Sequence, residues 1–227
     1  MISVVIPAYN EANYIGELLE VFSAFRDVEL IVAEDASTDG TAAIVQKFTE
    51  RVSNVKITSS DVLGGKGAAI KRGLSLASGD ILGFIDADLS IHPRDFMRVV
   101  AAIDNGADLA IGSRKLPESN VIERQPFFRR ISGSVYSILA RALVDTHVRD
   151  FQCGCKAFRR ALWDSLNISC DGFAFDTELI AQAHTKGFAV VEVPITWDNK
   201  TSSKVKMKRD VWPMLKCLLR VRADIRG

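Results

Sequence analysis

Two aspartates separated by one residue are the part of this sequence with the clearest chemical potential. Asp86, Ala87 and Asp88 directly follow an apolar run over residues 81–85. Such a run is typical of a buried strand, and open α/β sheets place their chemistry at the carboxyl ends of strands. Because alternate residues of an extended segment point the same way, Asp86 and Asp88 can converge on Mg²⁺ or Mn²⁺. The alternative is a turn and a helix N-cap before Pro93.

Three further segments carry polar residues at similar places. Pro7 is expected to end the first strand, after which Tyr9 offers a ring to a nucleobase and Glu11 an acceptor to base or ribose. Asp35 falls at the end of the second strand, where it can accept from a ribose hydroxyl. A glycine-rich loop around Lys66 can seat a phosphate, although it has neither the Walker nor the dinucleotide spacing. Each segment alone also fits an ordinary capped turn.

The elements that must position these residues alternate between strand and helix. Strands are expected over residues 2–7, 28–34, 55–59, 80–86 and 108–112, with helices over 12–25, 41–52, 66–77 and 93–105. This alternation predicts βαβ units and a mainly parallel sheet flanked by helices. In the second half we expect a helix over 127–144, a strand over 155–158, helices over 160–167 and 176–186, and a strand over 189–194.

Length and composition favour one globular domain. The 227 residues are 48% hydrophobic and 25% charged, and no low-complexity linker divides them. The strand pattern begins at Ile2, which leaves no room for a signal peptide, and no apolar segment approaches the roughly 20 residues that span a bilayer. We therefore expect a cytoplasmic protein.

Cysteine spacing and charge distribution give weaker indications. The four cysteines lack the spacing of a metal site, so we expect free, structural thiols at Cys153, Cys155, Cys170 and Cys217. The net charge is +1, yet from Lys200 onward nine basic residues face two acidic ones. This tail indicates either an anionic partner or a solvated charged face. It contains no nucleic-acid-binding motif, so we expect no nucleic-acid partner.

Taken in order, these segments resemble glycosyltransferase family 2, which has the GT-A fold. The resemblance covers most of the chain and extends to residues 112–114, 150–158 and 175–179. It is strongest to polyprenyl-phosphate sugar transferases such as dolichyl-phosphate mannose and glucose synthases. It implies a single Rossmann-like α/β domain in which residues 1–113 bind the nucleotide sugar and residues 114–227 bind the acceptor.

The resemblance also implies roles for individual residues. It implies that the nucleoside is bound by Pro7, Tyr9, Glu11 and Asp35, and the nucleotide by Asp86 and Ala87. The metal is expected to be bound by Asp88 together with Asp86. Phosphates are expected to be bound by Lys66 and Arg114, the acceptor phosphate by Arg129, and the diphosphate by Lys204. Two positions depart from the family pattern. Ser90 stands where mannose synthases have a metal-binding Gln, and Asp198 stands where an arginine is expected. The first departure favours a glucose-synthase-like relative.

Asp176 has three interpretations. It is a candidate general base if the acceptor is a hydroxyl, and it binds sugar hydroxyls or organises the site if the acceptor is a phosphate, which is already a nucleophile. It can also be a helix N-cap. With Asp88 and Arg114 it completes the candidate catalytic set.

The function expected from this resemblance is inverting, metal-dependent transfer of a hexose from a UDP- or GDP-sugar to a polyprenyl or dolichyl phosphate. The apolar and basic segments 127–143 and 211–221 are typical of interfacial helices, or equally of core helices with a basic face. The first interpretation predicts a peripheral protein at the cytoplasmic face of the membrane. The alternatives are a family 2 transferase with a glycan or soluble hydroxyl acceptor and a catalytically silent binding module.

Overall fold

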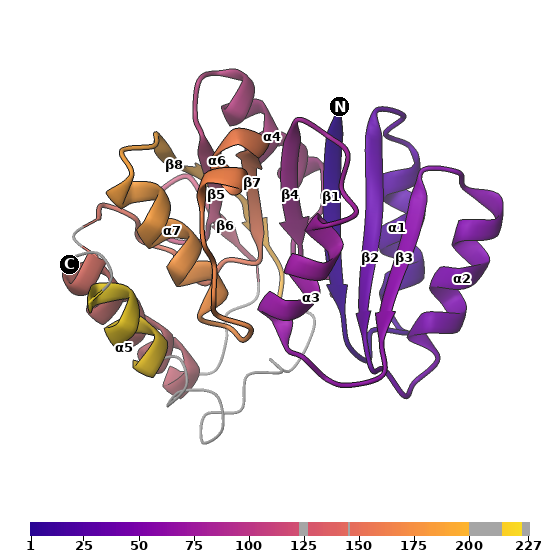
Figure 1. Ribbon diagram of the computed structural model, residues 1–227, viewed down its shortest axis with the longest axis horizontal. Helices are drawn as coiled ribbons and strands as arrows, with labels where there is room; N and C mark the ends of the chain where they lie inside the picture. Colours follow the sequence, from indigo (N-terminus) through magenta and orange to yellow (C-terminus); the bar gives the residue numbers. More distant parts are fainter. Residues whose placement is uncertain (123–126, 145, 200–214, 224–227) are drawn as a thin grey trace.

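A computed structural model describes residues 1–122, 127–144, 146–199 and 215–223, with the backbone alone for residues 127–135. The chain forms a central sheet with helices on both faces (Figure 1). The strands are β1 (Ile2–Ala8), β2 (Val28–Asp35), β3 (Val55–Ser60), β4 (Ile81–Ile85), β5 (Leu109–Ser113), β6 (Asn120–Val121), β7 (Cys155–Arg159), β8 (Val190–Pro194) and β9 (Thr196–Trp197). The helices are α1 (Ile15–Ser23), α2 (Thr41–Arg51), α3 (Lys66–Leu74), α4 (Pro93–Asp104), α5 (Phe127–Val144), α6 (Arg160–Ser165), α7 (Phe175–Thr185) and one over residues 215–223.

The main sheet has the strand order β3-β2-β1-β4-β7-β5-β8. Strand β7 pairs antiparallel with β4 and β5, and the other pairs are parallel. The predicted single α/β domain with a mainly parallel sheet is therefore confirmed. Strands from both halves of the chain share this sheet, since β7 and β8 are inserted beside β4 and β5. Two short strands, β6 and β9, form a separate parallel pair that the sequence did not predict.

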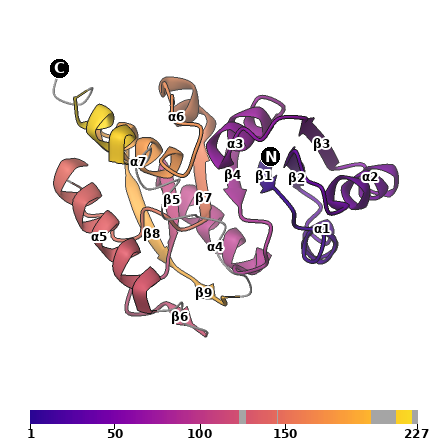
Figure 2. The same ribbon diagram turned by 90° about the horizontal axis from the view of Figure 1, so that it is seen from below.

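Side chains alternate between two cores, one on each face of the sheet. On β1, Val4 and Ile6 contact the core formed with α1, α2 and α4, whereas Val5 contacts the core formed with α3, α5 and α7. Figure 2 shows the two helical layers on opposite sides of the strands. This alternation is the period of two expected for extended chains, applied to a sheet that is buried on both faces.

Element boundaries differ from the expectations by a few residues. The first helix begins at Ile15 instead of residue 12, because residues 12–14 form a turn after Asn10, whose φ is 52°. The prediction that Pro7 ends the first strand was wrong: β1 continues to Ala8, and Pro7 pairs with Ala33 of β2. Pairing with β4 has already stopped at Val5, so Pro7 lies where β1 borders only β2. A missing amide proton is tolerated at such a place.

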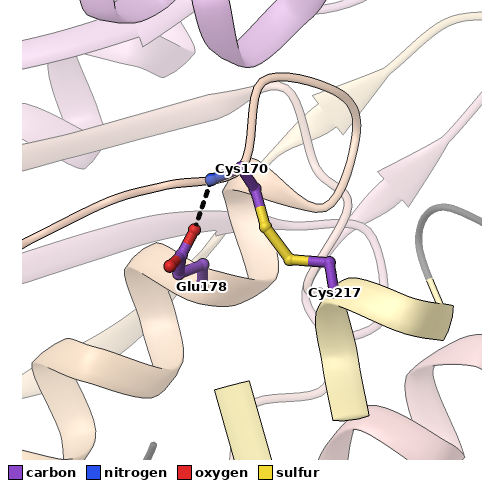
Figure 3. Close-up of side chains that lie close together, drawn as sticks. All are labelled: Cys170, Glu178 and Cys217. Carbon is purple, nitrogen blue, oxygen red and sulfur yellow. Dashed lines mark hydrogen bonds between the residues drawn. A yellow bond between two sulfur atoms is a disulfide. The ribbon is translucent and has the colours of Figure 1, made fainter. Parts of the chain in front are cut away.

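Two cysteines expected to be free are bonded to each other. Cys170, in the loop before α7, forms a disulfide with Cys217 of the helix over residues 215–223, and Figure 3 shows Glu178 of α7 accepting from the Cys170 amide beside this bond. The free-thiol expectation holds for Cys153 and Cys155, which are buried. Packing of the last helix against α7 and α5 brings together two cysteines that are 47 residues apart. The spacing of the cysteines in the sequence does not predict that contact.

Within the described residues, no helix has the length and apolar character needed to cross a bilayer.

Candidate active site

The candidate site lies at the carboxyl ends of β1, β2 and β4. These strands are parallel neighbours, so the segments that follow them emerge at one edge of the sheet (Figure 1). Asp35 is the last residue of β2, and Asp86 directly follows β4. Asp86 and Asp88 are partly exposed on either side of buried Ala87, which is the alternation that the sequence predicted. The backbone amide of Ser90 donates to Asp88 Oδ1 at 2.9 Å.

Lys66, the first residue of α3, is the cation nearest to this aspartate pair among the described contacts. Its Nζ lies 2.9 Å from Asp86 Oδ1 and 3.6 Å from Asp176 Oδ2. Lys66 is 11% exposed, Asp86 41% and Asp176 1%. Burial alone would lower the pKa of Lys66, but the Asp176 and Asp86 carboxylates more than offset it and raise that pKa. Lys66 is thus a protonated ammonium group at neutral pH.

The aspartate pair has the chemistry of a divalent cation site. Removal from bulk water raises the pKa of Asp86; the Lys66 ammonium opposes this rise, whereas the Asp88 and Asp176 carboxylates add to it. When two carboxylates lie close together, the charge of one makes the other harder to ionise. A cation bound between them stabilises the ionised form of both. Oxygen ligands of this kind suit Mg²⁺ or Mn²⁺, so Asp86 and Asp88 fit the expected metal.

The glycine-rich loop is held against Asp35. The backbone amides of Gly64 and Gly65 donate to Asp35 Oδ2 at 3.0 and 2.8 Å. Gly65 has a φ of 95°, a conformation that suits glycine. Asp35 Oδ1 is buried and has an ion pair with Arg72 at 3.5 Å but no hydrogen bond among the described residues. The structure places Asp35 at the predicted sheet edge, and its contact with a ribose stays a prediction.

Tyr9 and Glu11 flank the same edge from the turn after β1. Tyr9 is exposed and Glu11 is buried, and the Glu11 amide donates to Thr41 Oγ1 at 2.8 Å. The structure brings these two residues to the edge that carries Asp35 and Asp86, although contact with a nucleoside stays a prediction.

Arg114 is locked in place by a residue to which the sequence assigned no role. Its Nε and Nη2 donate to the two carboxylate oxygens of Asp150 at 2.7 and 2.8 Å, and its backbone amide donates to the same group. Burial would raise the pKa of Asp150, but the Arg114 guanidinium lowers it to about 2. The Arg114 guanidinium carbon also lies 5.5 Å from the centre of the Trp197 ring. This bidentate pair fixes the guanidinium after β5.

The segment after Asp150 packs directly on the aspartate pair. The Asp86 amide donates to Gly154 O at 2.9 Å, and a Cβ on Gly154 would lie 1.7 Å from Asp86 Oδ2. A side chain at position 154 would displace the Asp86 carboxylate, so Gly154 permits the position that this carboxylate has. Lys156, two residues further on β7, reaches Asp176 from the other side. Sequence reasoning missed Asp150, Gly154 and Lys156, although all three lie within the 150–158 motif.

Asp176 lies in the first turn of α7, but it is not the cap. The N-cap is Ala174, with no side-chain cap bond, so the N-cap interpretation was wrong. The carboxylate instead contacts Lys156 and Lys66, and its Oδ2 has no hydrogen bond among the described residues. Two further expectations fall on the side chain of Arg129 and on Lys204 as a whole, which lie outside the described residues.

Comparison with known proteins identifies the class: the chain has the GT-A fold and is a glycosyltransferase. The model described as "Glycosyl transferase family 2" matches residues 3–166. This chain belongs to that family.

Relatives with known names are similar over nearly the whole chain. The chain is 34% identical to "Glycosyltransferase AglD" of Haloferax volcanii over 96% of its own length, but it spans only 36% of that protein. It is 32% identical to "Polyprenol monophosphomannose synthase" of Mycolicibacterium smegmatis, covering 90% of this chain and 80% of the relative. It is 29% identical to "Dolichyl-phosphate beta-glucosyltransferase" of Dictyostelium discoideum, covering 97% and 73%.

Solved structures show the same fold. Glucosyl-3-phosphoglycerate synthase from Mycobacterium tuberculosis, crystallised with Mn²⁺, UDP and glucosyl-3-phosphoglycerate, superposes with a TM-score of 0.76. The two sequences are 24% identical, and the match covers 98% of this chain and 80% of the synthase. At this identity the likeness supports the fold alone.

Proposed function

We propose that this chain transfers a hexose, with inversion, from a UDP- or GDP-sugar to a polyprenyl phosphate such as dolichyl phosphate. The observation that carries the proposal is the Asp86, Asp88 and Lys66 cluster at the carboxyl edge of a family 2 sheet. The names of relatives similar over almost the whole chain support the acceptor class.

The charges of the site suit departure of a nucleoside diphosphate. Breaking the bond to the anomeric carbon adds negative charge to the diphosphate, and cations placed beforehand stabilise that charge. The Lys66 ammonium is fixed beside Asp86, and the Arg114 guanidinium is fixed by Asp150. A divalent ion held by Asp86 and Asp88 would supply further positive charge when bound. Asp35, the last residue of β2 at the same edge, is the residue that we propose accepts from the ribose.

The surroundings of Asp176 favour a phosphate acceptor over a hydroxyl. A general base must reach the proton that it removes, yet the Asp176 carboxylate is 1% exposed and contacts two lysines. A phosphate acceptor needs no such base, because its oxygen is already ionised and can attack the anomeric carbon from the face opposite the leaving group.

The peripheral membrane location is part of the same proposal. Ile138 and Leu139 of α5 and Leu219 of the helix over residues 215–223 are exposed, while Tyr136, Leu218 and Val221 are buried in the core beneath them. One part of each helix therefore packs inward while other apolar side chains are exposed, and the interfacial interpretation of these exposed side chains is the one that we propose. This outer face suits a bilayer surface that presents the lipid acceptor on the cytoplasmic side.

The test is product analysis with purified chain, radiolabelled UDP-glucose or GDP-mannose, and three acceptors: polyprenyl phosphate, the unphosphorylated polyprenol, and a soluble sugar. We expect label in the lipid fraction only with polyprenyl phosphate, loss of turnover with EDTA, and recovery with Mg²⁺ or Mn²⁺. The Ser90 departure predicts UDP-glucose as the better donor. Asp88→Ala should abolish metal-dependent turnover.

Label that appears only in the soluble sugar would replace the lipid acceptor with a hydroxyl one. A wild-type chain that binds vesicles or nucleotide sugars and yet shows no transfer to any acceptor would instead support a binding module.

A further inference from the structure

Lys156 is a fully buried lysine whose charge the proposed reaction does not yet use. It lies on β7, in the interior of the sheet, and its Nζ donates to Phe151 O at 3.1 Å, Cys153 O at 2.8 Å and Asp176 Oδ1. An ammonium group has three protons, so all three are used. A buried charge with such complete pairing is held in a single orientation.

Lys156 and Lys66 share the Asp176 carboxylate. Lys156 takes Oδ1 in a direct hydrogen bond, whereas Oδ2 faces Lys66 at 3.6 Å without a hydrogen bond. Lys66 is closer to Asp86, at 2.9 Å. The two ammonium groups lie 5.4 and 5.5 Å from the centre of the same Phe84 ring. Asp176 therefore forms a weaker ion pair with Lys66 and a direct hydrogen bond with Lys156.

We propose that Lys156 is a positioning residue for sugar transfer: it engages the Asp176 carboxylate so that Lys66 stays directed toward Asp86, where the diphosphate charge develops. This inference rests on the proposed function. Without Lys156, Lys66 would be the counter-ion left to Asp176 among the described ion pairs, and the attraction between them would draw the Lys66 ammonium away from Asp86.

Stability alone does not explain a charge at this position. Buried ion pairs are often no more stabilising than apolar side chains of similar volume, whereas removing one partner leaves an uncompensated charge. A methionine at position 156 with an asparagine at position 176 keeps nearly the same volume and carries no charge. The pair of substitutions therefore separates folding from the electrostatic role.

The experiment compares Lys156→Met, Asp176→Asn and the double variant with wild type in the full chain. Thermal melting reports folding, calorimetry with UDP or GDP and Mn²⁺ reports nucleotide binding, and steady-state transfer to polyprenyl phosphate reports kcat and KM. We expect Lys156→Met to melt earlier and to lose about 100-fold in kcat with a nearly unchanged donor KM, because the Asp176 carboxylate then draws Lys66 away from Asp86. The double variant has no charge at position 176 to attract Lys66, so it should melt close to wild type and recover most of that kcat.

The loss of kcat at a nearly constant donor KM, and the recovery of kcat when the Asp176 charge is also removed, form a readout that a purely structural role would not move. The matched control is Lys56→Met with Glu29→Gln, which removes an ion pair between the half-exposed Lys56 of β3 and the buried Glu29 of β2, and which should change melting without changing kcat or KM.

The outcomes separate this inference from the proposed function. A wild-type chain that neither binds nucleotide nor transfers sugar overturns both. Active wild type together with a Lys156→Met variant of equal kcat, or with a folded double variant whose kcat stays as low as that of Lys156→Met, overturns the role of Lys156 alone. A double variant that does not fold also overturns it, because the pair would then be required for folding itself.

Discussion

At the scale of the residue, Asp150 links the stability of the fold to the geometry of the site. Its pKa is lowered to about 2 against a usual value of 3.8, so its contribution is present above about pH 4 and is lost as the pH falls toward 2. Asp150→Asn should lower the free energy of unfolding by about 3 kcal/mol at pH 7, since it leaves Arg114 without its charged partner. Urea unfolding between pH 7 and pH 2.5 measures this, and the gap to wild type should narrow as acid is added.

Glu29 provides the matched control for that prediction. Burial raises its pKa, but hydrogen bonds from Lys56, Ser3 and Ser78 lower it to about 2. Glu29→Gln should therefore also reduce acid sensitivity, while leaving kcat/KM unchanged because Glu29 lies near the start of β2, away from the site. Asp150→Asn should lower kcat/KM by releasing Arg114. Equal losses of activity in both variants would mean that Asp150 acts only through stability.

The residues that sequence reasoning found and those that it missed differ in a physical way. Asp86, Asp88, Asp35 and Lys66 were predictable because each directly follows a strand pattern or a glycine-rich loop, and strand polarity alone places them at one edge. Asp150 and Lys156 act through partners 36 and 20 residues away, Arg114 and Asp176. Such pairs depend on which strand is inserted beside which, and the antiparallel β7 was not predictable from local periodicity.

At the scale of the element, the start of α3 is fixed by close packing against the loop before α7. A Cβ on Gly67 would lie 2.7 Å from Phe175 Cβ and 2.8 Å from Cys170 O. Gly67→Ala should therefore destabilise the fold by about 1–3 kcal/mol and lower turnover by displacing Lys66. Gly172→Ala in the facing loop is the control, because its Cβ would meet no atom within 4 Å. Equal melting temperatures and turnover in the two variants would contradict this account.

The outer face of α5 and of the helix over residues 215–223 gives a second prediction at this scale. Ile138, Leu139 and Leu219 are 63%, 41% and 62% exposed on helices that lie side by side (Figures 1 and 2), joined by a hydrogen bond from Arg222 to Leu143 O. Replacing all three with serine should weaken binding to anionic vesicles at least tenfold, because their apolar area no longer enters the bilayer. Vesicle sedimentation measures this change.

Leu76, just beyond the end of α3, is the control for the vesicle experiment. It is exposed to a similar extent but lies at the opposite end of α3 from Lys66. Leu76→Ser should leave vesicle binding unchanged. If it weakens binding as much as the triple variant does, the face formed by α5 and the last helix is not the membrane surface.

At the scale of the whole molecule, the alternation of strands and helices was sufficient to predict one α/β domain with a mainly parallel sheet. Each βαβ unit is a local pattern with one favoured handedness, so the order of the first half follows from the sequence. The second half was harder, because β7 enters antiparallel between β4 and β5 and because the last helix returns to pack on α5 and α7. Contacts of this kind between distant parts of the chain leave no periodic pattern in the sequence.

The Cys170–Cys217 disulfide bonds the last helix to the loop before α7, so its loss should destabilise the second half of the molecule. The loop that carries Cys170 also accepts from the Ala68 amide of α3 through Asp171 O, at 2.9 Å, so the bond connects the last helix to the element that positions Lys66. Closing a loop of this length stabilises a fold by about 2–4 kcal/mol. Reduction, or Cys217→Ser, should lower the free energy of unfolding by that amount, as measured by urea unfolding with and without a phosphine reductant.

Cys153→Ser, which removes a free buried thiol, should keep the sensitivity to reductant, whereas Cys217→Ser should lose it. An oxidised wild-type chain that shows four free thiols in denaturant would contradict the bond itself, and the stability of the last helix would then rest on its packing alone.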